Sequence, residues 1–382
     1  MFRVLQLPTT VGGNPQGLSK HLNILGLESE TLVLRQNHYN YPADTILWKE
    51  NESIHFREVK RWVAFSRNFL RYDIIHFNYG ATLFYPSWPY NPGSSPLKEV
   101  LRKIYSLYTR TLQVIELKTY KWLRKPMFIH YQGDDARQGD YSSENFEYNI
   151  ASQVNDSYYN RYSDEFKRTS IRRLGHYCEQ IYAVNPDLLH VLPEGSRFIP
   201  YSHISLDDWK PIYTQDQSDG PLRIGHAPSD RQVKGTDLFL SSLDELKSEG
   251  YSFELVLVEG LSNAEARKRY ETIDVLLDQL FAGWYGGLAV EAMALGKPVL
   301  VYIREGDLKF IPKEMKDDLP FVQVNPDTIK EGLRKVLDMP RSELLVLAKK
   351  SREYVEKWHD PLKIAQEIKD DYEKALRKYN KF

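Results

Sequence analysis

The residues best suited to chemistry lie in the segment Gly283–Pro298, which predicts a loop, a short helix and a stop before the β-branched strand Val299–Ile303. Gly286 and Gly287 open the predicted helix, where unpaired backbone N–H groups and the positive end of the helix dipole can receive an anion such as a diphosphate. The helix is apolar except for Glu291, and a buried carboxylate must be hydrogen-bonded. The pattern therefore predicts an anion site beside a carboxylate that a vicinal diol, such as a ribose, would satisfy.

Two cations precede a second predicted helix. Arg231 and Lys234 lie in the segment after the predicted strand Leu222–His226, which we expect to be a loop, and Gly235 follows Lys234. Arg can hold a diphosphate through two parallel hydrogen bonds, and Lys adds a point charge. The spacing predicts that both side chains bind the phosphates.

Polar groups also follow two strands predicted in the first half. The strand Phe2–Leu7 leads into the Gly-rich loop Thr10–Pro15, which contains Gly13, and His130 lies at the end of the strand Met127–Tyr131. The carboxyl ends of parallel strands are where open α/β sheets bind ligands. The polar groups after His130 suit either a local ion-pair cluster or an acceptor contact, and they are Asp134, Asp135 and Arg137.

The segment Gly283–Pro298 resembles the retaining, nucleotide-sugar-dependent glycosyltransferases of the GT-B fold, the large bacterial family 4-like or "group 1" enzymes. That family carries a Glu, seven residues, and then a second Glu that opens a helix followed by Ala-Met-Ala-x-Gly-x-Pro-Val. The second Glu matches Glu291, whereas the first would fall at Gly283 and is missing. This departure leaves the expected fold intact and bears on the identity of the donor sugar.

The resemblance implies a role for each matching residue. Glu291 would hold the donor ribose, and His130 would face the donor sugar and its β-phosphate. The residues implied in binding the nucleotide sugar are Gly13, Arg231, Lys234, Gly286, Gly287, Leu288 and Glu291. The family generally needs no metal, and the nucleoside diphosphate sugar is a substrate rather than a cofactor.

The expected reaction moves a sugar from a nucleoside diphosphate donor, UDP rather than GDP, to a carbohydrate or lipid-linked acceptor with retention, in surface polysaccharide or glycoconjugate assembly. Two alternatives stay open. A sugar-nucleotide 2-epimerase of the same fold would need no acceptor. A non-catalytic sugar- or lipid-binding partner would also be compatible with the missing Glu.

The chain of 382 residues suits two domains, and its alternating strand-like and helix-like segments predict parallel sheets. We therefore expect an α/β protein of the GT-B type, with two Rossmann-like domains facing each other across a cleft. The N-terminal, acceptor-side domain is expected at 1–205, a linker at 206–221, the nucleotide-sugar-binding domain at 222–358, and a helix packing back on the first domain at 359–382. Further strands are expected at Glu30–Leu34, Asp73–Phe77, Gln180–Val184, Arg197–Ile199, Phe253–Val258 and Ile273–Leu277.

Composition limits the partners. The net charge of −1 argues against a general nucleic-acid binder, and the single Cys178 excludes an internal disulfide framework. Because the sequence has no N-terminal signal and no apolar run of membrane-spanning length, we expect a cytoplasmic protein.

One segment of the first half is strongly basic. The predicted helix Leu97–Lys125 carries eight basic residues against Glu99 and Glu116, and the aromatic loop Leu83–Tyr90 precedes it. A basic helix beside aromatic side chains is typical of a peripheral contact with an anionic membrane, here the inner face of the cytoplasmic membrane. A core-packed helix with a solvated basic face fits the same pattern.

Overall fold

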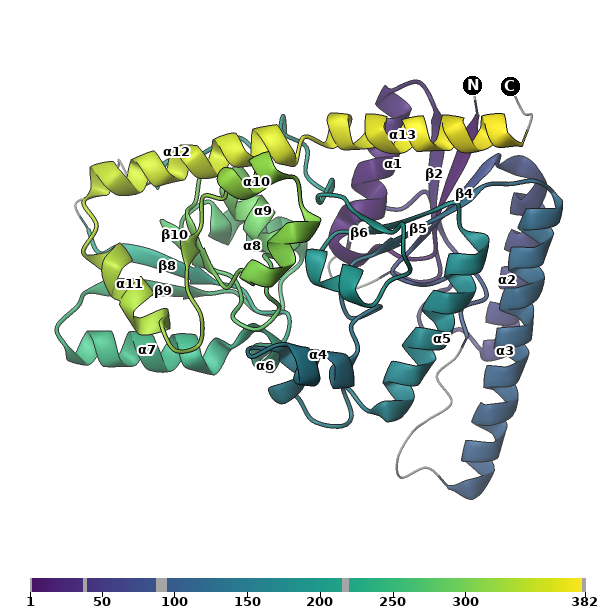
Figure 1. Ribbon diagram of the computed structural model, residues 1–382, viewed down its shortest axis with the longest axis horizontal. Helices are drawn as coiled ribbons and strands as arrows, with labels where there is room; N and C mark the ends of the chain where they lie inside the picture. The colour runs from purple at the N-terminus through teal and green to yellow at the C-terminus, as the bar shows by residue number, and fades with distance from the viewer. Residues whose placement is uncertain (1, 37–39, 87–94, 215–219, 380–382) are drawn as a thin grey trace.

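The computed structural model describes residues 2–36, 40–86, 95–214 and 220–379, which form two parallel β-sheets flanked by helices (Figure 1). The first sheet has the order β3-β2-β1-β4-β5-β6-β7, with β1 at Arg3–Leu7, β2 at Glu28–Val33, β3 at Thr45–Ile46, β4 at Ile74–Asn78, β5 at Met127–Tyr131, β6 at Gln180–Ala183 and β7 at Arg197–Phe198. The second has the order β12-β11-β10-β8-β9, with β8 at Leu222–His226, β9 at Phe253–Leu257, β10 at Val275–Leu277, β11 at Val299–Val301 and β12 at Val322–Gln323. The expected α/β architecture with two Rossmann-like sheets is confirmed.

The predicted strands agree closely with the observed ones. β5 and β8 have the predicted bounds, and the ends of the others differ by one or two residues. Strands β3 and β12 were not predicted from the sequence, and each has two residues at a sheet edge. Two residues are too few to show the alternation by which a strand is recognised.

Thirteen α-helices connect these strands in the described part of the chain. Their bounds are α1 Asn14–Ile24, α2 Ile54–Arg71, α3 Pro96–Trp122, α4 Gly139–Asn145, α5 Arg161–Tyr177, α6 Arg231–Lys234, α7 Thr236–Ser248, α8 Asn263–Tyr270, α9 Gly287–Ala294, α10 Lys313–Asp317, α11 Ile329–Leu337, α12 Arg341–Trp358 and α13 Pro361–Lys378. The last two helices are separate elements, because Asp360 caps the N-terminus of α13 and Pro361 occupies its first turn.

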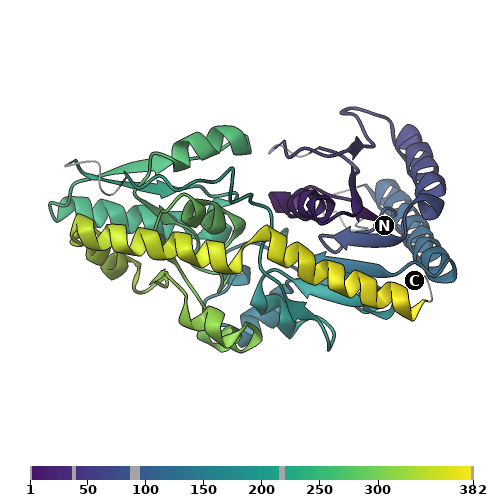
Figure 2. The same ribbon diagram turned by 90° about the horizontal axis from the view of Figure 1, so that it is seen from above.

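Helix α13 extends from the second sheet to the first, where it packs against α1 (Figures 1 and 2). His359, at the break before it, is fully buried, and its burial lowers the pKa of the ring to about 3. The neutral ring is held by both halves of the chain. Its Nδ1 donates to the Tyr201 carbonyl at 3.0 Å, and its Nε2 accepts from the Tyr285 hydroxyl at 2.9 Å.

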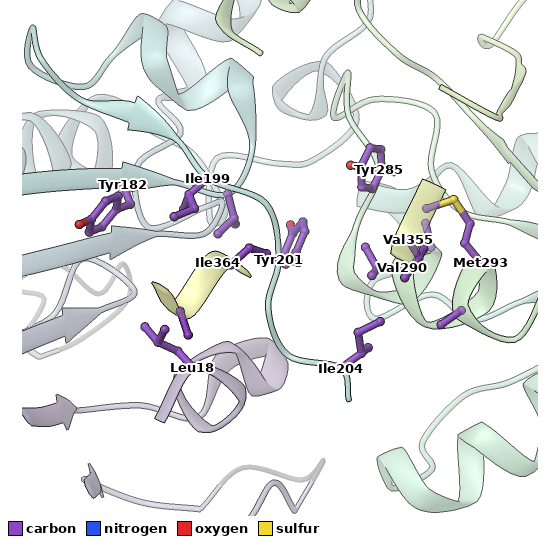
Figure 3. Close-up of a cluster of buried hydrophobic side chains, with 14 of the residues drawn as sticks. Leu18, Tyr182, Ile199, Tyr201, Ile204, Tyr285, Val290, Met293, Val355 and Ile364 are labelled. Carbon is purple, nitrogen blue, oxygen red and sulfur yellow. The ribbon is translucent and has the colours of Figure 1, made fainter. Parts of the chain in front are cut away.

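One hydrophobic cluster contains residues of both halves of the chain. Leu18 and Ile199 of the first half lie on one side of Tyr201, and Tyr285 and Val290 of the second half lie on the other (Figure 3). The predicted linker at 206–221 is described only outside 215–219. Its described part packs on the second half, since the backbone N–H of residue 212 donates to the carbonyl of residue 295 at 2.9 Å.

Helix α1 approaches the connection between the sheets very closely at Gly17. A Cβ atom at this position would lie 2.3 Å from the carbonyl oxygen of Ser202 and 2.6 Å from the Cα of His203. One turn earlier, the Asn14 side chain accepts a hydrogen bond from the backbone N–H of Ser202 at 2.9 Å. These two contacts fix the position of His203.

We expect Gly17→Ala to lower the free energy of unfolding by about 1–3 kcal/mol, because the added methyl group must displace backbone atoms. Urea unfolding monitored by circular dichroism measures the change. Gly306→Ala is the matched control, since a Cβ at this exposed glycine meets no atom within 4 Å. Equal losses in both variants would contradict a close approach specific to Gly17.

Candidate functional site

A cavity of about 430 Å³ lies at the carboxyl end of the second sheet. Segments after β8 and β9, together with α6, α8 and α9, form one side of it. The other side comes from the loop after β1, from Tyr41 and from His203 in the connection. The polar or conformationally special residues that line it are Gly12, Tyr41, His203, Ser229, Lys234, Gly260, Asn263, Gly287 and Glu291.

Glu291 is buried in the wall of this cavity, with 5% of its surface exposed. Its Oε1 accepts from the Asn263 side-chain amide at 3.0 Å and lies 3.5 Å from His203 Nε2. No described residue donates to Oε2. The site therefore offers a carboxylate oxygen to a ligand, while the buried His203 Nδ1 lacks a partner among the described residues.

Helix α9 begins at the cavity as predicted, but the two glycines differ in role. The Gly286 N–H donates to Asp278 Oδ2 at 2.7 Å, so this amide is not available to a ligand, contrary to the expectation. Gly287 and Leu288 both line the cavity, and their N–H groups lie in the first turn, where the helix offers no acceptor. The anion site at the helix start thus consists of two amides rather than three.

Lys234 reaches the cavity, whereas Arg231 does not. Lys234 Nζ contacts Asp278 at 3.1 Å and Gln279 at 2.7 Å. Arg231 is half exposed and makes two hydrogen bonds of 2.8 Å with Glu259. The expected loop is the short helix α6, because the Asp230 side chain caps the N–H groups that follow it.

The loop after β1 contributes through Gly12 rather than Gly13. Gly12 lines the cavity, while Gly13 is buried with a φ of +68°, and a Cβ there would lie 2.7 Å from the Tyr41 ring. Gly13 therefore allows Tyr41 to reach the cavity wall. Tyr41, Asn263 and His203 were not predicted, since each comes from a segment without a recognisable spacing.

His130 lies at the end of β5 and is 1% exposed. It does not line the cavity, but it ends a chain of hydrogen bonds. Gln6 donates to the Tyr372 hydroxyl, which contacts His76 Nδ1, and His76 Nε2 lies 2.6 Å from His130 Nδ1.

This chain determines which nitrogen of His130 carries the proton. Among the described residues His76 Nδ1 is the only acceptor within reach of the Tyr372 hydroxyl proton. The hydroxyl therefore donates to His76 Nδ1, so the His76 proton is on Nε2 and is donated to His130 Nδ1. The His130 proton is then on Nε2, which has no protein partner among the described residues. Burial lowers the pKa of His130 to about 3, so the ring is neutral at physiological pH.

Gly283 stands at the position where the family that this segment resembles has its first Glu. Gly283 has a φ of +75°, and a Cβ there would lie 2.4 Å from Arg304 Nη1. The Arg304 guanidinium stacks on the Phe146 ring at 3.7 Å, pairs with Asp307 at 2.8 Å and donates to the Tyr148 carbonyl at 3.0 Å. An arginine bound to both halves of the chain thus fills the space that a side chain at 283 would need.

A second cavity of about 570 Å³ lies at the carboxyl end of the first sheet. Burial raises the pKa of Asp135 in its wall to about 7, although two backbone N–H groups donate to this carboxyl. Asp134, despite its burial, is kept ionised by Arg137 and two tyrosine hydroxyls, which lower its pKa. Arg137 also pairs with Asp187, so Asp134 and Arg137 belong to an ion-pair cluster that borders this cavity.

In residues 2–36, 40–86, 95–214 and 220–379, no three His, Cys, Asp or Glu side chains are grouped as a metal ion would require. None of the helices in this same part of the chain combines the length and the apolar content of a bilayer crossing.

No protein-family model matches the sequence, and no curated protein does. Solved structures match over nearly the whole chain. Sucrose-phosphate synthase from Thermosynechococcus elongatus superimposes with a TM-score of 0.60 at 16% identity, covering 98% of this chain and 99% of that one. The chain has the GT-B fold. A glycosyltransferase from Rickettsia africae gives 0.56 at 14% identity and 98% of each chain, and MnaA of S. aureus, solved with UDP, gives 0.52 at 11% identity, covering 100% of this chain and 98% of that one.

The lowered pKa of His130 predicts a pH-dependent stability. Between pH 6.5 and about 3 the unfolded His130 is protonated and the folded one is not, so the free energy of unfolding falls as the pH falls, by about 1.4 kcal/mol per pH unit. His130→Asn should remove this contribution. Urea unfolding at pH 7.5, 6.5, 5.5 and 4.5 measures the difference in slope, with the exposed His55→Asn as the control. Parallel pH curves for wild type and His130→Asn would refute the assignment.

Proposed function

We propose that this protein is a retaining glycosyltransferase that moves a hexose from a nucleoside diphosphate donor, UDP rather than GDP, to a hydroxyl of a carbohydrate or lipid-linked acceptor. The observation that carries the proposal is the convergence of Glu291, His203 and Lys234 beside the amides that open α9. A carboxylate with a free oxygen suits a ribose diol, while the amides and the ammonium group suit a diphosphate. Surface polysaccharide or glycoconjugate assembly is the proposed setting.

Part of the cavity wall suits the base. Val258, Leu261, Ala266 and Tyr270 make this part apolar, and Gly260 lets the backbone approach closely. Apolar walls with a few placed polar groups are typical of small-ligand sites. The apolar groups would thus hold the base, Glu291 the ribose, and the start of α9 the diphosphate.

The reaction breaks the bond between the anomeric carbon and the β-phosphate oxygen and forms one to the acceptor oxygen on the same face. Negative charge grows on the leaving diphosphate, where the Gly287 and Leu288 amides and Lys234 can stabilise it. Each such donor is typically worth roughly 3 kcal/mol. The acceptor proton passes to the leaving phosphate oxygen, so no protein base is needed. Among the described residues that line the cavity at the second sheet, Glu291 is the sole carboxylate. We assign it to the ribose rather than to nucleophilic attack.

His130 would orient the donor through its Nε2–H, which the hydrogen-bond chain from Tyr372 leaves available. The acceptor would occupy the second cavity, whose wall includes Trp48, Tyr79 and Tyr85 together with Asp135. Aromatic faces with a nearby carboxyl group suit a sugar ring and its hydroxyls.

We expect Glu291→Gln and Lys234→Ala each to weaken UDP binding about tenfold or more, because each removes a charge-assisted contact. His203→Ala should weaken it to a smaller extent. Isothermal titration calorimetry with UDP measures the affinities, and thermal unfolding shows whether each variant is folded.

Two matched variants serve as controls. Lys268→Ala removes an exposed cation on α8, and Arg231→Ala removes the cation that pairs with Glu259 outside the cavity. Both should bind UDP like the wild type. Unchanged affinity in Glu291→Gln and Lys234→Ala would refute the proposed donor site.

A further inference from the structure

The N-terminal half of α3 exposes an apolar stripe. Leu97, Val100, Leu101, Ile104 and Leu107 recur at helical spacing and are between 53% and 70% exposed. Such spacing ordinarily marks the buried face of a helix. In the C-terminal half, Ile115 and Trp122 are also exposed, whereas Leu112, Leu117 and Tyr120 are buried in the core of the first sheet.

Helix α2 carries a matching stripe. Phe56, Val59, Val63 and Leu70 are between 47% and 68% exposed. The two helices lie side by side at the end of the molecule away from the second sheet (Figures 1 and 2), and a hydrogen bond of 3.3 Å joins Trp62 to Tyr108. We refer to these nine exposed apolar residues and the basic residues of both helices as the α2–α3 face.

The charge of this face is far from that of the whole chain. Helices α2 and α3 contain eleven basic and three acidic residues, an excess of eight, whereas the whole chain has a net charge of −1. Two of these side chains are buried: Glu116 accepts from the backbone N–H groups of Leu83 and Phe84, and Arg61 pairs with Glu58. Ten basic and two acidic residues remain, which is again an excess of eight. The basic groups are therefore concentrated where the apolar side chains are exposed.

These observations favour one occupant. A second copy of the chain would bring another excess of eight positive charges to the same interface, and like charges repel. Exposed leucines do not suit nucleic-acid phosphates. Apolar side chains flanked by Lys and Arg suit the boundary between acyl chains and anionic headgroups.

We propose that the α2–α3 face binds the surface of an anionic lipid bilayer. The apolar stripes insert at the acyl boundary, and the basic side chains contact the lipid phosphates. The face adjoins the second cavity, since Trp48 in the cavity wall donates to the carbonyl of Arg57 on α2 at 3.3 Å. A lipid-anchored acceptor would thus lie close to the cavity, although vesicle binding itself requires neither donor nor acceptor.

The structure also refines the basic segment predicted from the sequence. Lys125 is buried and contacts the Tyr72 carbonyl, so it cannot reach a membrane. Leu83 and Phe84 of the predicted aromatic loop are buried in the core, and residues 87–90 of that loop lie outside the described residues.

Sedimentation of the full chain with vesicles tests the proposal. One set of vesicles is phosphatidylcholine alone, and the other contains about 30 mol% of the anionic lipid phosphatidylglycerol. We expect binding to the anionic vesicles at low salt and its loss as salt screens the charges. Arg67→Glu, Lys98→Glu and Lys118→Glu together should lower the partition coefficient by about 100-fold or more, since each basic group near such a surface is worth about fivefold. Leu97→Gln, Leu101→Gln and Ile104→Gln together should also lower it.

Matched controls show whether binding depends on the α2–α3 face or only on the net charge and polarity of the protein. Lys247→Glu, Lys349→Glu and Lys374→Glu make the same charge change on exposed residues of α7, α12 and α13, and Val346→Gln with Leu362→Gln changes exposed apolar residues elsewhere. These variants should bind anionic vesicles nearly like the wild type. No binding at low salt, equal binding to both vesicle types, or a dimer that the Gln substitutions dissociate would overturn the proposal.

Discussion

The buried carboxylate of Glu291 is the constraint on which the rest of the structure depends. A carboxylate in an apolar helix is costly unless hydrogen-bond donors reach it. Here the contacts come from far apart in the sequence, since the Asn263 amide donates from the start of α8 and His203 Nε2 lies 3.5 Å away in the connection between the sheets. The site therefore exists only when the two halves of the chain are docked in one arrangement.

Several contacts maintain that arrangement. Gly17 allows α1 to pack on the connection, and buried His359 ties Tyr201 of the connection to Tyr285 of the second half. Arg304 and Asp307 extend this bridge to residues of the first half, since Asp307 also lies 2.8 Å from His190. Gly283 stands where the family that this segment resembles has its first Glu, and it leaves room for Arg304, which joins the two halves.

The same docking brings the two cavities to facing edges. Both lie at carboxyl ends of parallel strands, one for each sheet. His130 belongs to the first sheet, and its hydrogen-bond chain begins at Tyr372 on α13, the helix that extends from the second half. The C-terminal helix thus sets the tautomer of a ring in the first sheet.

Much of the fold could be predicted from the sequence because it depends on local patterns. β-branched runs located the strands, and the Gly-opened helix with a single Glu located the centre of the site. His203 and Asn263 could not be predicted, because their proximity to Glu291 arises from packing between remote segments. Arg231, predicted to bind the phosphates, does not line the cavity for a related reason: spacing gives the charge but not the direction of the side chain, which here points to Glu259.

The α2–α3 face shows what a sequence pattern leaves undecided. Apolar residues at helical spacing can form a stripe buried in the core or a stripe exposed to a partner. The structure shows that Leu97, Ile104, Ile115 and Trp122 of α3 are exposed, whereas Leu112 and Leu117 are buried. The exposed stripe, with the excess of basic residues around it, suggests a bilayer rather than a core.

The most direct test of the proposed function is a turnover screen of UDP- and GDP-sugars, with and without simple glycosides and lipid-linked sugars, read out by nucleotide release and by mass spectrometry and NMR of the sugar products. The account predicts release of UDP that requires an acceptor, a product with the anomeric configuration of the donor, and loss of this activity in Glu291→Gln. Conversion of a UDP-sugar to its C2 epimer without any acceptor would contradict it. So would the absence of turnover and binding for every nucleotide sugar, which would indicate a non-catalytic protein.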